Sequence, residues 1–303
     1  MKKRKMAWRY RYLYLLMLPG LIYLLINNYL PMAGLVIAFK KVNFRTGIWS
    51  SPWCGLENFK YLFATKDAWI ITRNTILYNL VFIILGLVVS VALAIFLSEM
   101  RSRKMRSVHQ GCLLIPYIIS YVVVSYLVYA FLGSNGLVNK GLLQEMGKNS
   151  VNWYLESKYW PFILVFVNTW KNAGYASVIY LATILGFDDS VYEAAQLDGV
   201  SPWQKIRYIT IPLLKPTIIT LTMLNVGRIF YSDFGLFYQV PQNSGAILNV
   251  TNVLDTYVYR GLLELGDVSM SSAAGLYQAV VGFFVIMAAN ALVRKISPDD
   301  AII

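Results

Sequence analysis

The chain has 303 residues, of which 57% are hydrophobic and only 14% are charged. A soluble globular domain carries about 25% charged residues, so this composition excludes an ordinary soluble protein. Lys and Arg outnumber Asp and Glu by 27 to 15, which gives a formal net charge of +12. Such a charge suits either a nucleic-acid-binding protein or a membrane protein, and the positions of the basic residues decide between them.

Long apolar runs separated by short charged segments predict several membrane-spanning helices. Four runs contain no Asp, Glu, Lys or Arg, and each exceeds the roughly 20 residues that cross a hydrocarbon core. Two further runs are apolar apart from isolated charges. In chain order, the predicted spans are 12–39, 74–98, 109–139, 159–187, 216–238 and 268–293. The chain is therefore predicted to be an all-α, polytopic membrane protein with six transmembrane helices and no separate soluble domain.

Prolines lie well inside the first and third of the predicted spans. A proline removes one helical hydrogen bond, and its ring clashes with the preceding turn. We expect Pro19 and Pro31 to bend or interrupt the first span and Pro116 to do the same in the third. Neighbouring helices of a bundle would then satisfy the freed backbone carbonyl groups.

The distribution of basic residues predicts the orientation in the membrane. Six spans place both termini on the same side. That side carries 15 Lys and Arg residues against 10 on the opposite side, with a dense cluster at Lys2, Lys3, Arg4 and Lys5. Because basic loops remain in the cytoplasm, both termini are expected inside. This distribution explains the net charge without nucleic acid as a partner.

A polar segment between the predicted fourth and fifth spans carries the signals of two capped helices. Ser190 precedes Glu193 at the spacing of a capping box, and Ser201 precedes Gln204 in the same way, with proline at the first helical position. Gly199 lies between them, where a helix end favours a left-handed residue. Two interpretations fit these residues: an amphipathic helix lying on the membrane, or a docking element for a soluble partner.

No segment of the sequence supports a catalytic site. The single histidine, His109, has no Cys or carboxylate neighbours at metal-ligand spacing. The run 141–149 approaches a phosphate-binding loop, but it has one residue too many between its glycines, and Asn149 replaces the Ser or Thr that would hold magnesium. The chain is predicted not to be an enzyme and to hold no cofactor of its own.

Polar residues within the predicted fourth and fifth spans are candidate contacts for a substrate. Ionisable groups inside a bilayer are costly unless they face a partner or a wet cavity. Amides, charges and aromatic rings suit the hydroxyl groups and the apolar face of a sugar. An equally supported interpretation pairs Arg228 with Asp233, or with another subunit, and lets Lys171 extend to the membrane surface. The candidates are Asn168, Trp170, Lys171, Asn172, Asn225, Arg228, Tyr231 and Asp233.

The polar segment also contains the most specific motif of the chain. Glu193-Ala194-Ala195 is followed after three residues by Gly199 and after nine more by Ile209-Thr210-Ile211-Pro212. This spacing resembles the EAA loop of binding-protein-dependent ABC importer permeases, with Ile211 where that family usually has Leu. The run 55–59, Gly-Leu-Glu-Asn-Phe, is similar to a segment of carbohydrate-uptake permeases related to the maltose permease, in the branch for oligosaccharides or polysaccharide fragments.

The resemblance implies a function and a set of partners. Residues 1–303 would form one permease domain of a type I ABC importer in the bacterial plasma membrane. The loop at about 188–213 would place coupling helices in the cleft of a cytoplasmic ATPase. Expected partners are a second homologous permease, two ATPases that bind the ATP and magnesium, and an extracytoplasmic binding lipoprotein that delivers a carbohydrate, in particular an oligosaccharide. The coupling contacts would be Glu193, Ala194, Ala195, Asp198 and Gly199.

Two other classes of function stay open at this point. An ion-coupled secondary sugar carrier needs titratable groups near the midplane and usually an internal repeat. Arg228 and Asp233 supply the former, but the sequence shows no convincing repeat. A membrane scaffold without transport activity would not need the capped polar segment. ATPase subunits that stay bound in detergent would distinguish a permease from both alternatives.

Overall fold

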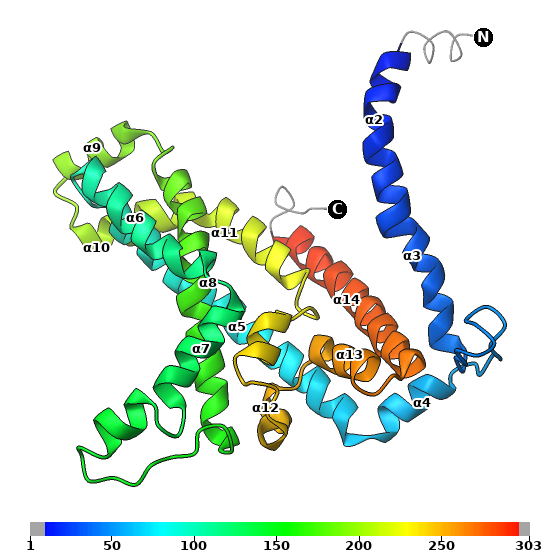
Figure 1. Cartoon of the computed structure of the whole chain (residues 1–303). Helices are drawn as coiled ribbons and strands as arrows, with labels where there is room; N and C mark the ends of the chain where they lie inside the picture. Colours follow the sequence, from blue (N-terminus) through cyan, green and yellow to red (C-terminus); the bar gives the residue numbers. More distant parts are fainter. Residues whose placement is uncertain (1–9, 297–303) are drawn as a thin grey trace.

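The protein is almost entirely helical. The structure is a computed structural model that describes residues 10–296, so the basic cluster 2–5 lies outside the described range. Within that range, the β-structure is limited to an isolated antiparallel bridge between Lys40 and Trp53. The predicted all-α architecture is confirmed for the described residues (Figure 1).

The first span is one helical rod whose winding changes along its length. The helix continues through Pro19 without interruption, whereas a widened π-helical turn lies directly before Pro31. The wider turn accommodates the ring of proline, which has no backbone N–H to donate, so the helical rod continues. None of its first three segments has a buried residue, and α2 stands away from the other helices (Figure 1). The segments are α2 (Arg11–Leu24), η1 (Leu25–Tyr29), α3 (Leu30–Met32) and η2 (Ala33–Phe39).

A short helix contacts the C-terminal end of this rod. α4 (Glu57–Ala64) begins within the run 55–59 that the sequence singled out. Its Asn58 amide donates to the carbonyl oxygens of Ala38 at 2.8 Å and Lys40 at 3.1 Å, where the helix ends. The asparagine therefore satisfies carbonyl groups that a helix C-terminus leaves without partners.

The long helices α5 (Lys66–Ser98) and α8 (Trp160–Ile184) lie against each other. α5 has 33 residues and contacts α8 along its length. α8 also contacts α6 (Arg103–Ile118) at close range. A side-chain carbon added to Gly174 would lie only 1.9 Å from the carbonyl oxygen of Leu113, so glycine is required at this crossing.

The predicted third span is broken. α6 is followed by α7 (Tyr121–Leu132) after a turn of two residues, and the two helix axes are bent by 92°. Ser120 caps α7 by accepting from the backbone N–H of Val123 at 3.4 Å. The interruption predicted at Pro116 is thus present a few residues later, and α7 ends at Leu132 rather than at residue 139. Two short segments, η3 (Val138–Leu143) and η4 (Ser157–Tyr159), then lead to α8.

The predicted fifth span begins and ends earlier than the sequence suggested. Helical structure runs from Pro202 to Val226, so residues 227–233 are not helical. The predicted start at Pro216 followed from the charge of Lys215 directly before it, yet the helix begins earlier and continues through both residues. The remaining elements are η6 (Gly235–Gln239), η7 (Gly245–Ile247), α12 (Leu248–Thr251), α13 (Leu254–Leu263) and the last span, α14 (Val268–Ile296).

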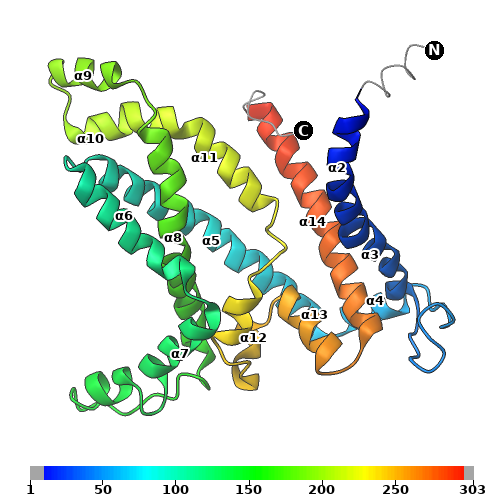
Figure 2. The same ribbon diagram turned by 45° about the horizontal axis from the view of Figure 1, so that its top comes forward.

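The described helices fit the predicted number of spans without reproducing it in full. Four runs are long and apolar enough to cross a membrane, and the bent pair α6–α7 would be a fifth. α8 has 25 residues but carries Asn168, Lys171 and Asn172 in its middle, which lowers its mean hydropathy. The start of α2, the end of α14 and the segment between α8 and α11 lie toward one end of the molecule, as both views show (Figures 1 and 2).

Candidate coupling loop and candidate substrate path

The candidate coupling loop begins with α9 (Asp189–Leu197), whose cap differs from the prediction. The Asp188 side chain accepts from the backbone N–H of Ser190 at 2.9 Å, so Asp188 is the N-cap. Ser190 donates to the cap instead of forming it, and the capping box with Glu193 is absent. An aspartate is among the strongest N-caps, which explains the earlier start. The same hydrogen bond lowers the pKa of the Asp188 carboxyl, because it favours the charged form.

The turn after α9 follows the prediction closely. Gly199 has a φ of +72°, in the left-handed region. Its N–H donates to the carbonyl of Gln196 at 3.2 Å, and the N–H of Val200 donates to that of Ala195 at 3.0 Å. This pair of bonds is the Schellman motif that closes a helix C-terminus. No neighbouring atom lies within 4 Å of the position of an added side-chain carbon, so the backbone angle alone favours glycine.

The second helix of the loop starts as predicted but does not end. Ser201 and Gln204 form a reciprocal capping box, with the Ser201 N–H donating to the Gln204 side chain at 2.9 Å. α10 (Pro202–Lys205) then continues through the π turn η5 (Ile206–Thr210) into α11 (Ile211–Val226). The predicted second short helix is therefore the first turn of a membrane span. Any displacement of α10 acts directly on that span.

The motif residues of the loop differ in their exposure. Glu193, Ala194, Asp198 and Gly199 are exposed, whereas Ala195 is 7% exposed and packs within its own chain. The Glu193 carboxylate has no hydrogen-bond or ion-pair partner among the side chains that the structure describes. Large apolar side chains lie nearby on the surface: Leu197 is 90% exposed and Trp203 is 67% exposed. The loop thus presents a free carboxylate, a small residue and apolar side chains together, which suits a protein groove.

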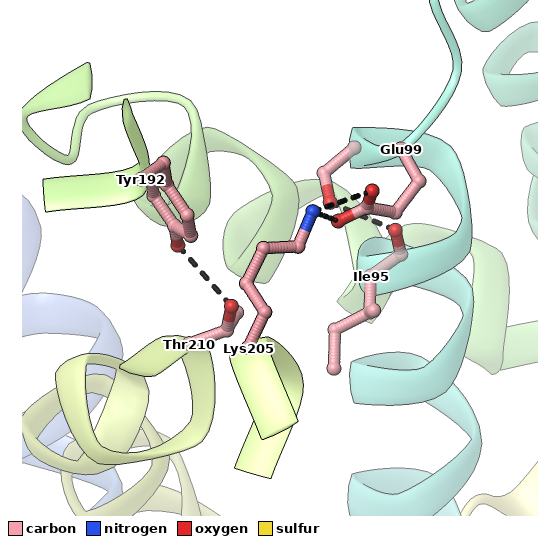
Figure 3. A network of polar contacts seen from close by, with 6 residues as sticks. Ile95, Glu99, Tyr192, Lys205 and Thr210 are labelled. Atoms are coloured by element: carbon pink, nitrogen blue, oxygen red, sulfur yellow. Dashed lines mark hydrogen bonds and ion pairs between the residues drawn. The ribbon is translucent and has the colours of Figure 1, made fainter. Parts of the chain in front are cut away.

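Two side-chain contacts fix the loop, one within it and one to the bundle, and sequence reasoning identified neither. The Tyr192 hydroxyl lies 3.2 Å from the Thr210 hydroxyl, and the Lys205 ammonium lies 2.7 Å from both carboxylate oxygens of Glu99 (Figure 3). Lys205 and Glu99 are 106 residues apart in the chain, so no local pattern relates them. The only hint in the sequence was that Glu99 is the single carboxylate of an otherwise basic loop, which indicates a cationic partner.

Lys171 lies in the α8 face that meets the break between α6 and α7. Its side chain is buried, and its ammonium donates to the carbonyl oxygens of Pro116 at 3.1 Å and Tyr117 at 2.9 Å, and also to that of Ile119. The ring of Tyr121 lies 4.9 Å from the ammonium. The expected extension of Lys171 to the membrane surface is therefore wrong. The lysine instead satisfies the backbone carbonyls at the end of α6.

Two of the other α8 candidates, Asn168 and Asn172, form a polar strip beside Lys171. The Asn172 amide donates to both the backbone and side-chain oxygens of Asn168 at 3.0 Å. Trp170 is 40% exposed and lies on a different face of the helix. Two rings that sequence reasoning did not select, Tyr117 and Tyr175, stack with centroids 4.3 Å apart and planes 8° apart. The pair joins α6 to α8 close to the break.

The candidates of the fifth span lie around the non-helical stretch 227–233. Asn225, Arg228, Tyr231 and Asp233 are all exposed in the isolated chain. Arg228 and Asp233 do not form an ion pair with each other, and the Arg228 side chain has no partner in the described part of the chain. Asp233 accepts from the backbone N–H of Leu236 at 3.3 Å. Of the two pairings considered for Arg228, the one within the chain is wrong.

Side chains from three other helices satisfy the backbone of this stretch. The Asn79 amide donates to the Ile229 carbonyl at 2.9 Å, and the Gln278 amide donates to the Phe230 carbonyl at 2.6 Å. The Asp255 carboxylate accepts from the Ser232 N–H at 2.7 Å. Non-helical backbone inside a membrane protein requires such partners. In the sequence these side chains are noticeable only as single polar residues among apolar ones. The sequence alone does not show which backbone group each of them meets.

The chain matches known proteins over most of its length. Residues 86–298 match the family described as binding-protein-dependent transport system inner membrane component. The polygalacturonan/rhamnogalacturonan transport system permease protein YteP of Bacillus subtilis (strain 168) is 33% identical over 294 residues, which cover 95% of this chain and 89% of that protein. The trehalose/maltose transport system permease protein MalF of Thermococcus litoralis is 28% identical over 276 residues, 88% of each chain.

The fold of this chain is similar to that of a chain in a solved structure. The crystal structure of a bacterial ABC transporter involved in the import of the acidic polysaccharide alginate contains a chain that is 32% identical, with a TM-score of 0.89. The match covers 98% of this chain and 100% of that chain. A second structure of an alginate ABC transporter, in complex with a periplasmic protein that holds an alginate pentasaccharide, gives a TM-score of 0.87 at 31% identity.

Proposed function

The chain belongs to the family of inner membrane components of binding-protein-dependent transport systems, and we propose that it is the permease subunit through which an acidic oligosaccharide enters the cell. Within this family the chain is a transport subunit and a multi-pass membrane protein. The relatives that support an acidic cargo have names that refer to polygalacturonan and alginate, both polymers of uronic acids. A uronate needs cationic or amide donors along its path.

Arg228 is the observation that carries this proposal. Its guanidinium group is exposed at the non-helical stretch of the fifth span and has no carboxylate partner in the described part of the chain. An unpaired arginine within a membrane segment is costly unless a ligand or another subunit compensates its charge. Its planar donors match a carboxylate in two parallel hydrogen bonds, which is the geometry a uronate offers.

Around Arg228, the path would use exposed polar groups of the fourth and fifth spans. Residues with free donors, acceptors or rings contact the sugar, and Lys171 contributes differently because its ammonium is already engaged. We assign Lys171 to the support of the break in the third span, next to the path. The remaining contacts are Asn168, Trp170, Asn172, Asn225, Tyr231 and Asp233.

The loop between α8 and α11 would couple this path to ATP hydrolysis by two cytoplasmic ATPase subunits. The contact surface consists of Glu193, Ala194, Asp198 and Gly199, with Leu197 and Trp203 as its apolar part. Ala195 shapes the surface from beneath, since it packs inside its own chain. ATP and magnesium bind to the partners, and this loop and both termini lie in the cytoplasm.

Two further partners complete the proposed assembly. A second, homologous permease would cover apolar side chains that this chain leaves exposed, of which α2 is the clearest case because it has no buried residue. An extracytoplasmic binding lipoprotein would deliver the oligosaccharide at the opposite end from the coupling loop. The assembly resides in the bacterial plasma membrane.

Uptake by the reconstituted complex tests the proposal. Proteoliposomes containing both permeases, the ATPases and the binding protein are given labelled trigalacturonate, with neutral maltotriose as the control sugar. Loss of the Arg228 contact should lower trigalacturonate uptake about tenfold or more, the equivalent of at least about 1.4 kcal/mol. Arg228→Lys should retain part of the uptake that Arg228→Ala loses. Equal uptake of both sugars, or uptake that needs no ATPase subunits, would overturn the acidic cargo or the importer mechanism, respectively.

A further inference from the structure

Two polar side-chain contacts fix the coupling loop, and among the described residues only one of them reaches the remainder of the chain. Tyr192 of α9 meets Thr210 of η5, and Lys205 of α10 meets Glu99 at the end of α5 (Figure 3). The first link stays within the segment that leads into α11. The second joins the loop to a different membrane helix, so it determines how the loop sits on the bundle.

Glu99 is placed where its charge opposes its own helix. It is the C-cap residue of α5, and its backbone N–H donates to the carbonyls of Ile95 and Leu97. The carbonyl end of a helix carries partial negative charge, so a carboxylate there is unfavourable unless a cation compensates it. Lys205 supplies that cation through contacts of 2.7 Å to both oxygens. The position of Glu99 is therefore explained by its partner and not by the stability of α5.

The helix that carries Glu99 reaches across the molecule. α5 has 33 residues, which gives a length of about 50 Å at the rise of an α-helix. It starts beside α4, toward the end of the molecule opposite the coupling loop, as both views show (Figures 1 and 2). Its last turns contribute Ala94 and Leu97 to an apolar cluster with Leu214 of α11. Apolar packing holds these helices together without direction, whereas the ion pair defines the contact between two particular side chains.

The ring of Tyr192 also lies near this contact, 5.9 Å from the Lys205 ammonium. Lys205 is thus positioned between the carboxylate of α5 and the first helix of the loop. Its side chain is 26% exposed and that of Glu99 is 48% exposed. Ion pairs with this exposure contribute little to stability, so removal of one partner should leave the fold and the assembly intact.

We propose that Lys205 and Glu99 form a positioning pair that transmits movements of the coupling loop to α5. This inference rests on the proposed function of the loop. When the ATPases displace the loop, α10 pushes on α11 through the continuous helix and pulls on α5 through the ion pair. The two helices then move together, and the path along the fifth span changes with them. Without the pair, the loop moves α11 alone.

Charge reversal in the assembled transporter tests the pair. The variants are Glu99→Lys, Lys205→Glu and the double exchange, studied in nanodiscs with the partner permease, the ATPases and the binding protein loaded with trigalacturonate. Each single variant should retain bound ATPase and basal hydrolysis, while stimulation of hydrolysis by the loaded binding protein falls at least about fivefold, the low end of typical coupling effects. The double exchange should restore stimulation to within about twofold, because it restores the attraction.

A matched control is available in the exposed ion pair of Lys158 and Glu156, at 3.4 Å in a connecting segment. Lys158→Glu should leave stimulation unchanged. The inference is overturned if single variants are stimulated normally, if they lose the ATPase subunits, or if the double exchange stays as defective as the single ones. Failure of the proposed function has a different signature: the wild-type complex itself would then show no stimulation by the loaded binding protein.

Discussion

The ammonium nitrogen of Lys171 lies 3.1 Å from the carbonyl oxygen of Pro116, so a side chain of α8 completes the end of α6. A helix that stops inside a membrane protein leaves carbonyl groups without partners, and a cation near the helix C-terminus compensates both their hydrogen bonds and their partial charge. The break in the third span and the lysine in the fourth are thus two parts of one structural element.

Lys171→Met should destabilise the protein strongly. Methionine fills a similar volume but leaves the carbonyls of Pro116 and Tyr117 buried without donors. An unsatisfied buried polar group costs about 1–3 kcal/mol, so the melting temperature in detergent should fall by several degrees. Trp170→Phe, one residue away at a 40% exposed position, is the control. An unchanged melting temperature of Lys171→Met would show that the carbonyls find other donors.

Gly174→Ala should separate α6 from α8. The added carbon would lie 1.9 Å from the backbone oxygen of Leu113, which cannot move without its helix. Overpacking of this kind costs about 1–3 kcal/mol, and a backbone contact places the variant at the upper end. Gly111→Ala on α6 serves as the matched control, because no atom lies within 4 Å of its added carbon. Thermal unfolding of both variants would decide, since equal stability contradicts the close crossing.

The Gly199 turn should discriminate between substitution by alanine and substitution by asparagine. Gly199 has a φ of +72° and open space around it, so Gly199→Ala introduces only backbone strain of about 1–2 kcal/mol. Gly199→Asn should be milder, because asparagine tolerates the left-handed region. Stimulated ATPase activity of the assembled complex should therefore decrease in the order wild type, Asn variant, Ala variant. A reversed order would indicate that contacts of the side chain, and not the turn, determine coupling.

The sequence predicts the loop better than it predicts the spans, for a physical reason. Caps and glycine turns depend on neighbours within four residues, so Gly199 and Ser201 follow from local chemistry. The cap at Asp188 was missed because two aspartates and a serine compete within three positions. The end of the fifth span at Val226 depends on Asn79 and Gln278, which lie more than 45 residues away and supply the hydrogen bonds that helix would otherwise provide.

The same distinction applies to the candidate site. Their isolated positions in apolar runs mark Lys171 and Arg228 as unusual. In the structure the Lys171 ammonium is hydrogen-bonded to backbone carbonyls, whereas the Arg228 side chain has no partner among the described residues. Nothing within either span indicates that difference. It arises from where α6 breaks relative to α8, which is a property of the packed bundle.

Asp188 should make the start of α9 sensitive to acid. Its pKa is lowered by the hydrogen bond from Ser190, so the charged cap stabilises the helix at pH values above the ordinary aspartate range. That stabilisation is lost as the pH falls through the lowered pKa of the folded protein. Protection of the Ser190 amide against hydrogen exchange, corrected for the intrinsic rate, should therefore decline below about pH 4. Asp188→Asn should keep the cap and lose the pH dependence, because an amide oxygen accepts the same bond without titrating. If protection declines equally in both proteins, another group controls the start of the helix.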